Sequence, residues 1–420
     1  MNRLFVTQVA LCAGLATAVT AALAQSVTLS GAELAPATLL KSPRHTVAEP
    51  VTVEGHLGVF VIESKFGKFT VRGTNLLAAR VQELQAIEEL QKVQKDSAFT
   101  EALGKSASGI AKFAVNTVDD PGKTAESIGK GVGTVFGRMG YMAKSGASYV
   151  GDKAVDATTG ASKGAGGSAP AGDPAPPSFT GDPFGYNKAR REWAKKLNID
   201  PYTSNPVLRP LLDSAAQASF AGNFAVNLTL GAAMAPISYA YSFDETVRDS
   251  VWNKAPVDLE KENLEKLLAL GVKDRTARDF ARNKWFTPSL QTALVARLGA
   301  LGRIDGMDSV IATAANTQGE VRARFLLESL AMLAAFHEKD GKLTRIRMSN
   351  LVPVGSTADG RVVAALAIDY ALWDADAKAF TQRKELTAKS RTLLIAGKAS
   401  PEAKAGLEKA GWIVKPGLRA

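Results

Sequence analysis

Three carboxylates close together near the C-terminal end of the chain are the residues with the most evident chemical potential. Asp369, Asp374 and Asp376 fall within residues 368–376, IDYALWDAD, with a tyrosine and a tryptophan among them. Paired carboxylates act as general acid and base in glycoside hydrolysis, and an aromatic neighbour suits a sugar ring. We therefore name these aspartates as candidate catalytic residues. The competing interpretation is a strand cap followed by a solvated turn, where aspartate is also common.

Other residues with catalytic potential are few. The chain of 420 residues contains three histidines, His45, His56 and His337, and one cysteine, Cys12. Zinc sites and Cys–His dyads need more of these residue types. Neither H-E-x-x-H nor G-x-S-x-G occurs in the sequence, so the usual metalloprotease and hydrolase signatures are missing. We expect no metal and no cofactor, and a protein that is not an enzyme is the favoured interpretation.

A row of glycines is the sharpest pattern outside the carboxylates. Gly129, Gly133 and Gly137 repeat every four residues, which places them on one face of a helix. The basic side chains of this stretch are Lys130, Arg138 and Lys144. Small residues at this spacing let another backbone approach closely, and a basic amphipathic helix can lie on a membrane surface. We predict membrane or partner contact through 121–150; the alternatives are a soluble helical hairpin and a partly disordered stretch.

The segment from Ser214 to Phe243 contains no charged residue and is rich in small side chains. It has three interpretations: a membrane-embedded segment, a buried helix of a soluble body, or the lining of an apolar cavity in a lipid or small-ligand carrier. Its amides and hydroxyls favour the buried helix, because polar groups are costly in lipid.

The first 24 residues are typical of a secretory signal. Arg3 precedes an uncharged apolar stretch, and Ala22-Leu23-Ala24 forms an A-x-A cleavage site. We expect cleavage near Ala24 and a periplasmic or secreted protein, with peripheral membrane association as an option. Cys12 lies within the signal, so the mature chain would form no disulfides and would depend on packed cores.

A low-complexity stretch divides the mature chain. Residues 157–182 consist mainly of Gly, Ala, Ser and Pro, a composition typical of a flexible linker. Before it, 25–156 predicts an N-terminal unit with an extended leading segment, a β-hairpin over 57–72 and a helix over 75–95 capped by Asn75. The Gly-rich amphipathic helices described above complete this unit.

After the linker, residues 183–420 predict an α+β unit that is mostly helical with a small late antiparallel or mixed sheet. Helical periodicity marks six stretches: 187–197, 258–270, 274–284, 288–300, 305–315 and 319–338. Asn205-Pro206 indicates a further helix start. Alternating residues over 343–354 and 361–370 flank an Asp359-Gly360 turn, and a strand–helix–strand unit ends the chain.

Basic residues gather at the start of this second unit. Arg190, Arg191, Lys195 and Lys196 lie within one predicted helix. They indicate either a docking surface for an anionic partner or, as we favour, a solvated helix face beside a structured turn.

Net charge completes the functional interpretation. Lys and Arg number 51 against 41 Asp and Glu, a net charge of +10, without the concentrated basic patch typical of nucleic-acid binders. We expect no nucleic-acid partner, and an envelope protein, membrane surface or anionic polymer instead.

The favoured hypothesis for the function is a non-catalytic binding or scaffold module of the cell envelope. The alternatives are a periplasmic hydrolase using the carboxylates near Asp369 and Asp374, and a lipid or small-ligand carrier.

Overall fold

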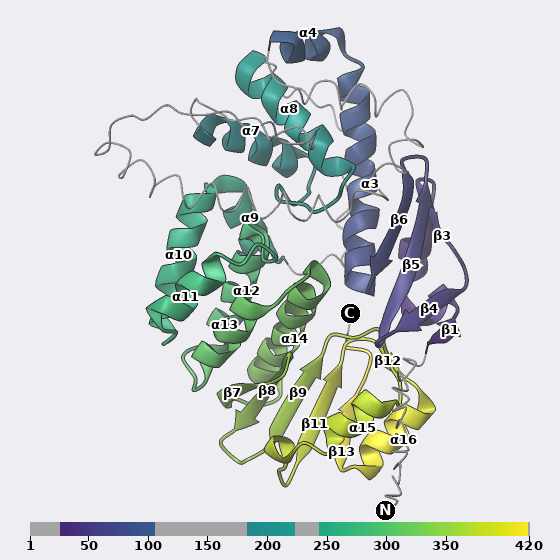
Figure 1. Ribbon diagram of the computed structural model, residues 1–420, viewed down its shortest axis with the longest axis vertical. Helices are drawn as coiled ribbons and strands as arrows, with labels where there is room; N and C mark the ends of the chain where they lie inside the picture. Colours follow the sequence, from purple (N-terminus) through teal and green to yellow (C-terminus); the bar gives the residue numbers. More distant parts are fainter. Residues whose placement is uncertain (1–25, 106–182, 223–242, 419–420) are drawn as a thin grey trace, which may run out of the picture.

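The computed structural model describes residues 26–105, 183–222 and 243–418 (Figure 1). The expected signal, the linker 157–182 and the candidate contact residues Gly129, Lys130, Gly133, Gly137, Arg138 and Lys144 lie outside the described residues. So does the part of the uncharged segment from 223 to 242.

The chain begins with a six-stranded sheet rather than the single hairpin expected. Its strands are β1 (Val27–Leu29), β2 (Lys41–Ser42), β3 (His45–Val47), β4 (Val51–Glu54), β5 (Leu57–Ser64) and β6 (Gly67–Arg72). The β5–β6 hairpin is as predicted. The leading segment is not merely extended, since it also forms the short helices α1 (Gly31–Leu34) and α2 (Ala37–Leu40). A capping box of Ser30 and Glu33 starts α1, and both residues of this local signal are present in the sequence.

One helix, α3 (Thr74–Gln94), packs against this sheet, and three more helices pack on α3 or on one another and share its core. These three are α4 (Ser97–Lys105), α7 (Pro183–Lys196) and α8 (Leu208–Gly222). Phe60 and Ile62 of β5, Leu84 of α3, Trp193 of α7 and Leu212 of α8 are fully buried in one cluster. This core therefore takes residues from both sides of the expected linker. The described part of the uncharged segment, 214–222, forms the end of α8, and its first residues are buried there.

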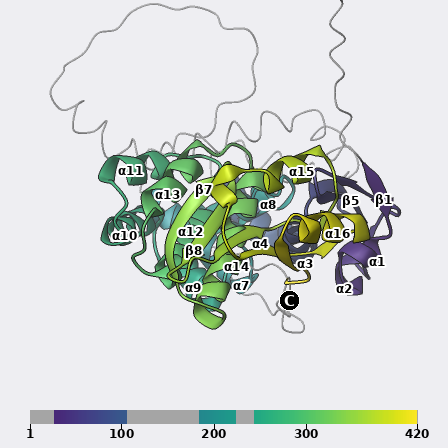
Figure 2. The ribbon, with the colours of Figure 1, turned by 90° about the horizontal axis from the view of Figure 1, so that it is seen from below.

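A layer of helices follows, at the opposite end of the molecule from the N-terminal sheet (Figure 2). It comprises α9 (Glu245–Asn253), α10 (Pro256–Ala269), α11 (Asp274–Ala281), α12 (Pro288–Leu301), α13 (Met307–Asn316) and α14 (Glu320–Lys339). The five helices expected between 258 and 338 are confirmed within a few residues. Pro256 and Pro288 stand at the first turns of α10 and α12, where a missing N–H costs nothing.

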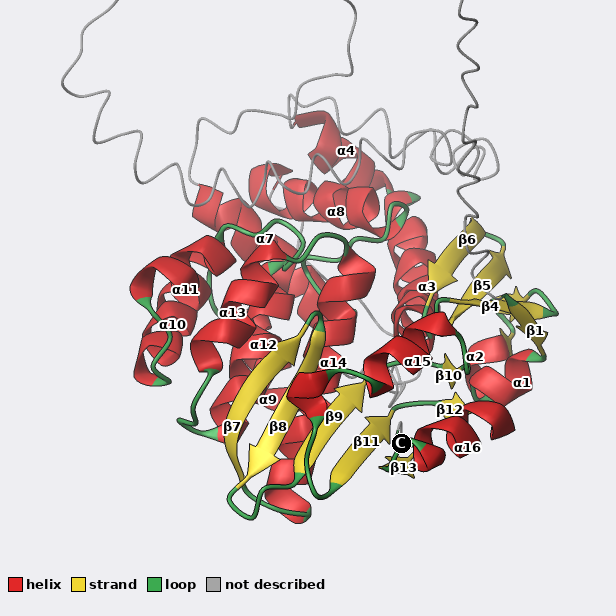
Figure 3. Ribbon diagram, turned by 60° about the horizontal axis from the view of Figure 1, so that its bottom comes forward, coloured by secondary structure: helices red, strands yellow, loops and turns green. Residues whose placement is uncertain are grey.

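The last part is a five-stranded mixed sheet between two helical layers (Figure 3). Strands β7 (Leu343–Ser349), β8 (Val352–Thr357) and β9 (Val362–Leu366) are antiparallel, and β11 (Arg391–Ile395) and β13 (Trp412–Lys415) run parallel to β9. Two parallel crossovers pass through α15 (Ala375–Thr381) and α16 (Pro401–Lys409), as parallel neighbours require. A short parallel pair, β10 (Tyr370–Ala371) and β12 (Lys398–Ala399), lies beside them.

The two faces of this sheet bury different cores. Val363, Ala365 and Leu394 face the α9–α14 layer, whereas Ala364 and Leu393 face α15 and α16. Alternate residues of buried strands point to opposite faces, so both sets are apolar. The fold is α+β, with an N-terminal sheet, a helical body and a late mixed sheet. Within the described ranges, no helix is long and apolar enough to cross a membrane.

Candidate functional site

Asp369 lies where the N-terminal sheet meets the C-terminal mixed sheet. It is 1% exposed. Its Oδ2 accepts the backbone N–H of Gly58 at 2.8 Å, and its Oδ1 accepts that of Thr74 at 3.1 Å. Thr74 is the first residue of α3, and the N–H groups of a helix start need an acceptor. Asp369 therefore caps α3 from another part of the chain, and the expected cap Asn75 is wrong because the helix has already begun there.

His56 and Asp374 meet in the same interface. Gly55 and His56 form the tight turn between β4 and β5, both with positive φ, so His56 lies outside both strands. Its Nδ1 accepts the N–H of Leu372 at 3.1 Å, which leaves the ring hydrogen on Nε2. That Nε2 lies 3.4 Å from Asp374 Oδ2. Asp374 Oδ1 also accepts the N–H of Ala377, so the residue caps α15.

The three candidate aspartates differ in their surroundings. Asp369 is buried, Asp374 is partly exposed, and Asp376 is exposed in the first turn of α15. The structure brings His56 to Asp374, a pairing that sequence spacing could not indicate because the residues are far apart in the chain. Among the described residues, no group of three or more His, Cys, Asp or Glu side chains is arranged to hold a metal ion.

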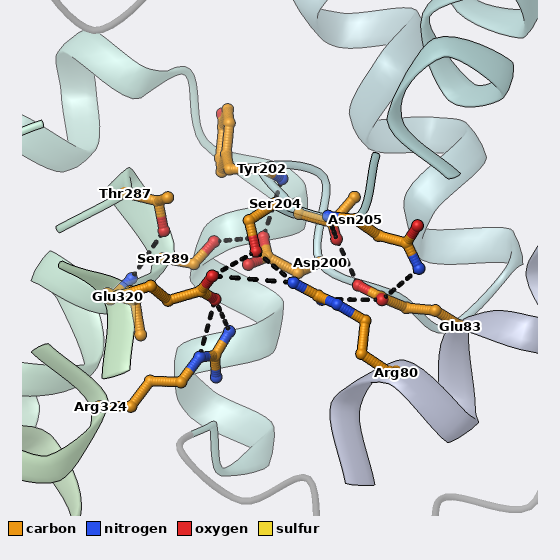
Figure 4. Close-up of polar contacts among 12 residues, drawn as sticks. Arg80, Glu83, Asp200, Tyr202, Ser204, Asn205, Thr287, Ser289, Glu320 and Arg324 are labelled. Atoms are coloured by element: carbon orange, nitrogen blue, oxygen red, sulfur yellow. Dashed lines mark hydrogen bonds and ion pairs between the residues drawn. The ribbon is translucent and has the colours of Figure 1, made fainter. Parts of the chain in front are cut away.

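The largest concentration of buried charge lies elsewhere, between α3, the α7–α8 loop and α14 (Figure 4). Glu83 of α3 accepts hydrogen bonds from Arg80 Nη1 at 2.9 Å, from Asn205 Nδ2 at 2.8 Å and from Thr203 Oγ1. Asn205 Oδ1 accepts the N–H groups of Val207 and Leu208 at the start of α8. The predicted cap at Asn205 is thus confirmed, and the same side chain also engages Glu83.

The network continues from Arg80 into α14. Ser204 Oγ accepts from Arg80 Nη2 and donates to Glu320 Oε2 at 2.6 Å. Arg324 Nε donates to Glu320 Oε1 at 2.8 Å. Burial acts to raise the pKa of Glu320, but the guanidinium groups of Arg324 and Arg80 outweigh it and the pKa is lowered. Two acids and two arginines thus compensate one another inside the protein, each at most 9% exposed.

A cavity of about 70 Å³ opens beside this network. Its wall contains Glu83 of α3, Asp200 of the α7–α8 loop, Arg248 and Trp252 of α9 and Arg324 of α14. Other lining residues are Ala79, Gln82, Asn198, Ile199, Pro201, Thr203, Phe243, Val251 and Ser289. Elements distant in sequence therefore converge on one polar recess, which is the usual setting of a binding site.

Asp200 is the carboxyl group on the cavity wall that lacks an ion pair among the described residues. Its Oδ1 accepts both the Ser289 hydroxyl at 2.5 Å and the Tyr202 N–H at 2.8 Å. Burial raises the pKa of Asp200, and these hydrogen bonds offset the rise only in part. The sequence signal for this loop is weak and consists of the turn-forming residues of 200–206.

The basic helix α7 differs from the solvated face that we favoured. Arg190 and Arg191 are 4% and 7% exposed. Arg190 Nη1 lies 3.3 Å from Asp213 Oδ1 of α8, and its guanidinium stands 6.0 Å from the ring centre of Tyr202. Lys195 and Lys196 are exposed as expected. Two of the four basic residues, Arg190 and Arg191, are thus buried where α7 packs against α8.

No family model, curated protein or solved structure matches this chain. The cavity and the His56–Asp374 interface are therefore the two sites from which function can be argued.

Proposed function

We propose that this protein is a non-catalytic binding module of the cell envelope, which takes a small ligand in the cavity between α3, the α7–α8 loop, α9 and α14. The observation that carries the proposal is the cavity itself, with walls fixed by the buried Arg80–Glu83–Glu320–Arg324 network. Side chains locked by such partners lose little freedom on binding, which favours recognition. Asp369 and Asp374, in contrast, have their carboxylates engaged as helix caps.

Ligand binding can be tested by filling the cavity. Ala79 lines it from α3, so Ala79→Leu should occupy part of the space and reduce or abolish binding. Ala405→Leu on the exposed face of α16 is the matched control. Native mass spectrometry of the mature protein, purified without added ligand, would show a bound small molecule in the parent and control but not in Ala79→Leu. Equal occupancy in all three would reject the cavity as the site.

The envelope part of the proposal is supported by the signal-like residues 1–24 and the basic glycine-rich stretch 121–150. Sequencing the N-terminus of the exported protein should give Gln25 as its first residue. Fractionation should find part of the full mature chain with membranes, and a deletion of 121–150 only in the soluble fraction. If both forms remain wholly soluble, membrane contact through 121–150 is rejected.

A hydrolase acting through Asp374 is the second candidate, and the observation in its favour is the 3.4 Å contact between His56 Nε2 and Asp374 Oδ2. Asp374→Asn retains an oxygen to cap α15 but removes the charge. Under this hypothesis the variant loses any glycan- or peptide-degrading activity while its thermal unfolding is little changed. Equal activity in the variant would dismiss Asp374 as a catalytic group.

A further inference from the structure

Some of the charged side chains around the cavity have a partner of opposite charge, and others do not. Glu83 is saturated by Arg80, Thr203 and Asn205. Arg324 is paired with Glu320 through Nε and Nη2. Each of these charges therefore has its counter-charge within the protein wall, and neither requires a ligand for neutrality.

Arg248 is the cation on the cavity wall that has no ion pair among the described residues. Among the described residues, no carboxylate lies within ion-pair distance of its guanidinium, and its Nε is buried without a hydrogen-bond partner. The guanidinium instead stands 5.8 Å from the ring centre of Trp252, one turn along α9. The Nε of this guanidinium is shielded from water and has no anionic partner. Such a group favours the binding of an anion.

Asp200 is the second group on the cavity wall that has no ion pair among the described residues. Asp200 directs Oδ1 to the Ser289 hydroxyl and the Tyr202 N–H. Its burial favours the uncharged form of the carboxyl group. Glu83 and Arg324, the other titratable groups on the wall, hold their own partners as described above.

Part of the wall is apolar, and the space is small. Trp252, Phe243, Val251 and Pro201 supply aromatic and aliphatic surface. A water-sized molecule needs roughly 10–15 Å³ of such volume, so a cavity of about 70 Å³ holds about five to seven non-hydrogen atoms. This size excludes a sugar polymer or a lipid chain lying wholly inside.

We propose that the cavity binds a small organic anion of the size of a short-chain carboxylate, whose charged end pairs with Arg248 and whose carbon chain contacts Trp252 and Phe243. This inference rests on the proposed binding function and specifies the ligand class. It also assigns α9 the role of supplying both the cation and the aromatic surface.

The test is calorimetric titration of the mature protein with three probes of similar size: propionate, the uncharged propionamide, and inorganic phosphate. Propionate should bind, and propionamide should bind at least about tenfold more weakly, as the loss of a charge-assisted hydrogen bond predicts. Phosphate should also bind more weakly than propionate, because it cannot use the apolar wall.

Three variants identify the cation. Arg248→Gln should weaken propionate binding by about tenfold or more, and Arg248→Lys should restore part of it. Arg275→Gln on α11, whose side chain is 95% exposed, should leave binding unchanged. Circular dichroism and thermal unfolding of each variant establish that the fold is retained.

The contrary outcomes separate the two proposals. Equal binding of propionamide and propionate, or full binding by Arg248→Gln, would overturn the anion site while leaving a ligand cavity. Phosphate binding as tightly as propionate would overturn the organic part of the ligand. If no probe binds and native mass spectrometry finds no small molecule, the cavity has no binding role and the proposed function fails with it.

Discussion

At the residue scale, Asp369 is a candidate catalytic side chain whose carboxylate also stabilises the fold. Its two oxygens accept the N–H groups of Gly58 and Thr74 inside the protein. Removing the carboxylate in Asp369→Ala would leave both buried donors unsatisfied, at about 1–3 kcal/mol each. We expect the free energy of unfolding in urea to fall by about 2–6 kcal/mol. Asp376→Ala, at an exposed position, should change it by less than about 0.5 kcal/mol. Similar values for the two variants would contradict the capping role.

Asp200 gives a residue-scale prediction that depends on pH. Because its pKa is raised in the folded protein, the folded state holds this proton more tightly than the unfolded chain. Its contribution to stability is complete below the unfolded pKa of about 3.9 and is lost as the pH rises through the folded value. Asp200→Asn keeps an oxygen for Ser289 and Tyr202 but has no charge to bury. The difference in free energy of unfolding, Asn variant minus parent, should therefore increase from about pH 4 to pH 7. A difference that stays constant with pH would show that Asp200 is not destabilised as an anion.

At the scale of single elements, the start of α3 depends on a backbone conformation. Gly73 precedes the helix with φ +90° and ψ +138°, a conformation that costs an L-residue roughly 1–3 kcal/mol. The space is adequate, since a Cβ there would meet only Leu57 at 3.8 Å. Gly73→Ala should therefore lower stability by about 1–3 kcal/mol through strain alone. Gly299→Ala in α12, with nothing within 4 Å of the added atom, should raise it by about 0.5–1 kcal/mol. If denaturant unfolding shows that both variants change the free energy of unfolding in the same direction, this explanation is refuted.

The sequence predicts a helix or strand when the residues that determine it lie within the element itself. The β5–β6 hairpin and helices α10–α14 have periodicity, prolines or caps within their own residues, and they were predicted. The separate strands β7 and β8 were merged because their turn depends on Asn350 at φ +55°, which no sequence period marks. The cap of α3 was missed because Asp369 is distant in the chain. The buried state of Arg190 and Arg191 was missed because their compensation by Asp213 and Tyr202 exists only after α7 packs on α8. The cavity likewise exists only after four distant segments meet.

At the scale of the whole molecule, the first core joins parts of the chain on both sides of residues 106–182. Trp193, Leu211 and Leu212 are buried with Phe60 and Leu84. The polar network adds a second connection, since Arg80 and Glu83 of α3 engage Ser204, Asn205 and Glu320. The low-complexity residues 157–182 therefore separate two stretches of sequence that pack as one body in the described residues. The N-terminal sheet alone would expose the apolar side of α3, which a small unit cannot compensate.

Cutting the chain within 157–182 tests this arrangement directly. A protease recognition sequence placed there should allow cleavage into two fragments that still elute together in gel filtration, because the shared core holds them. Residues 25–156 expressed alone should show neither a cooperative unfolding transition nor native-like exchange protection.

A charge placed in the shared core should separate the cleaved fragments. Leu212→Asp, at a fully buried position, should have this effect, since an unpaired charge cannot remain in that core. The exposed substitution Ala405→Asp on α16 is the control and should leave them together. Fragments that part without any substitution would instead show that the two stretches fold as independent domains.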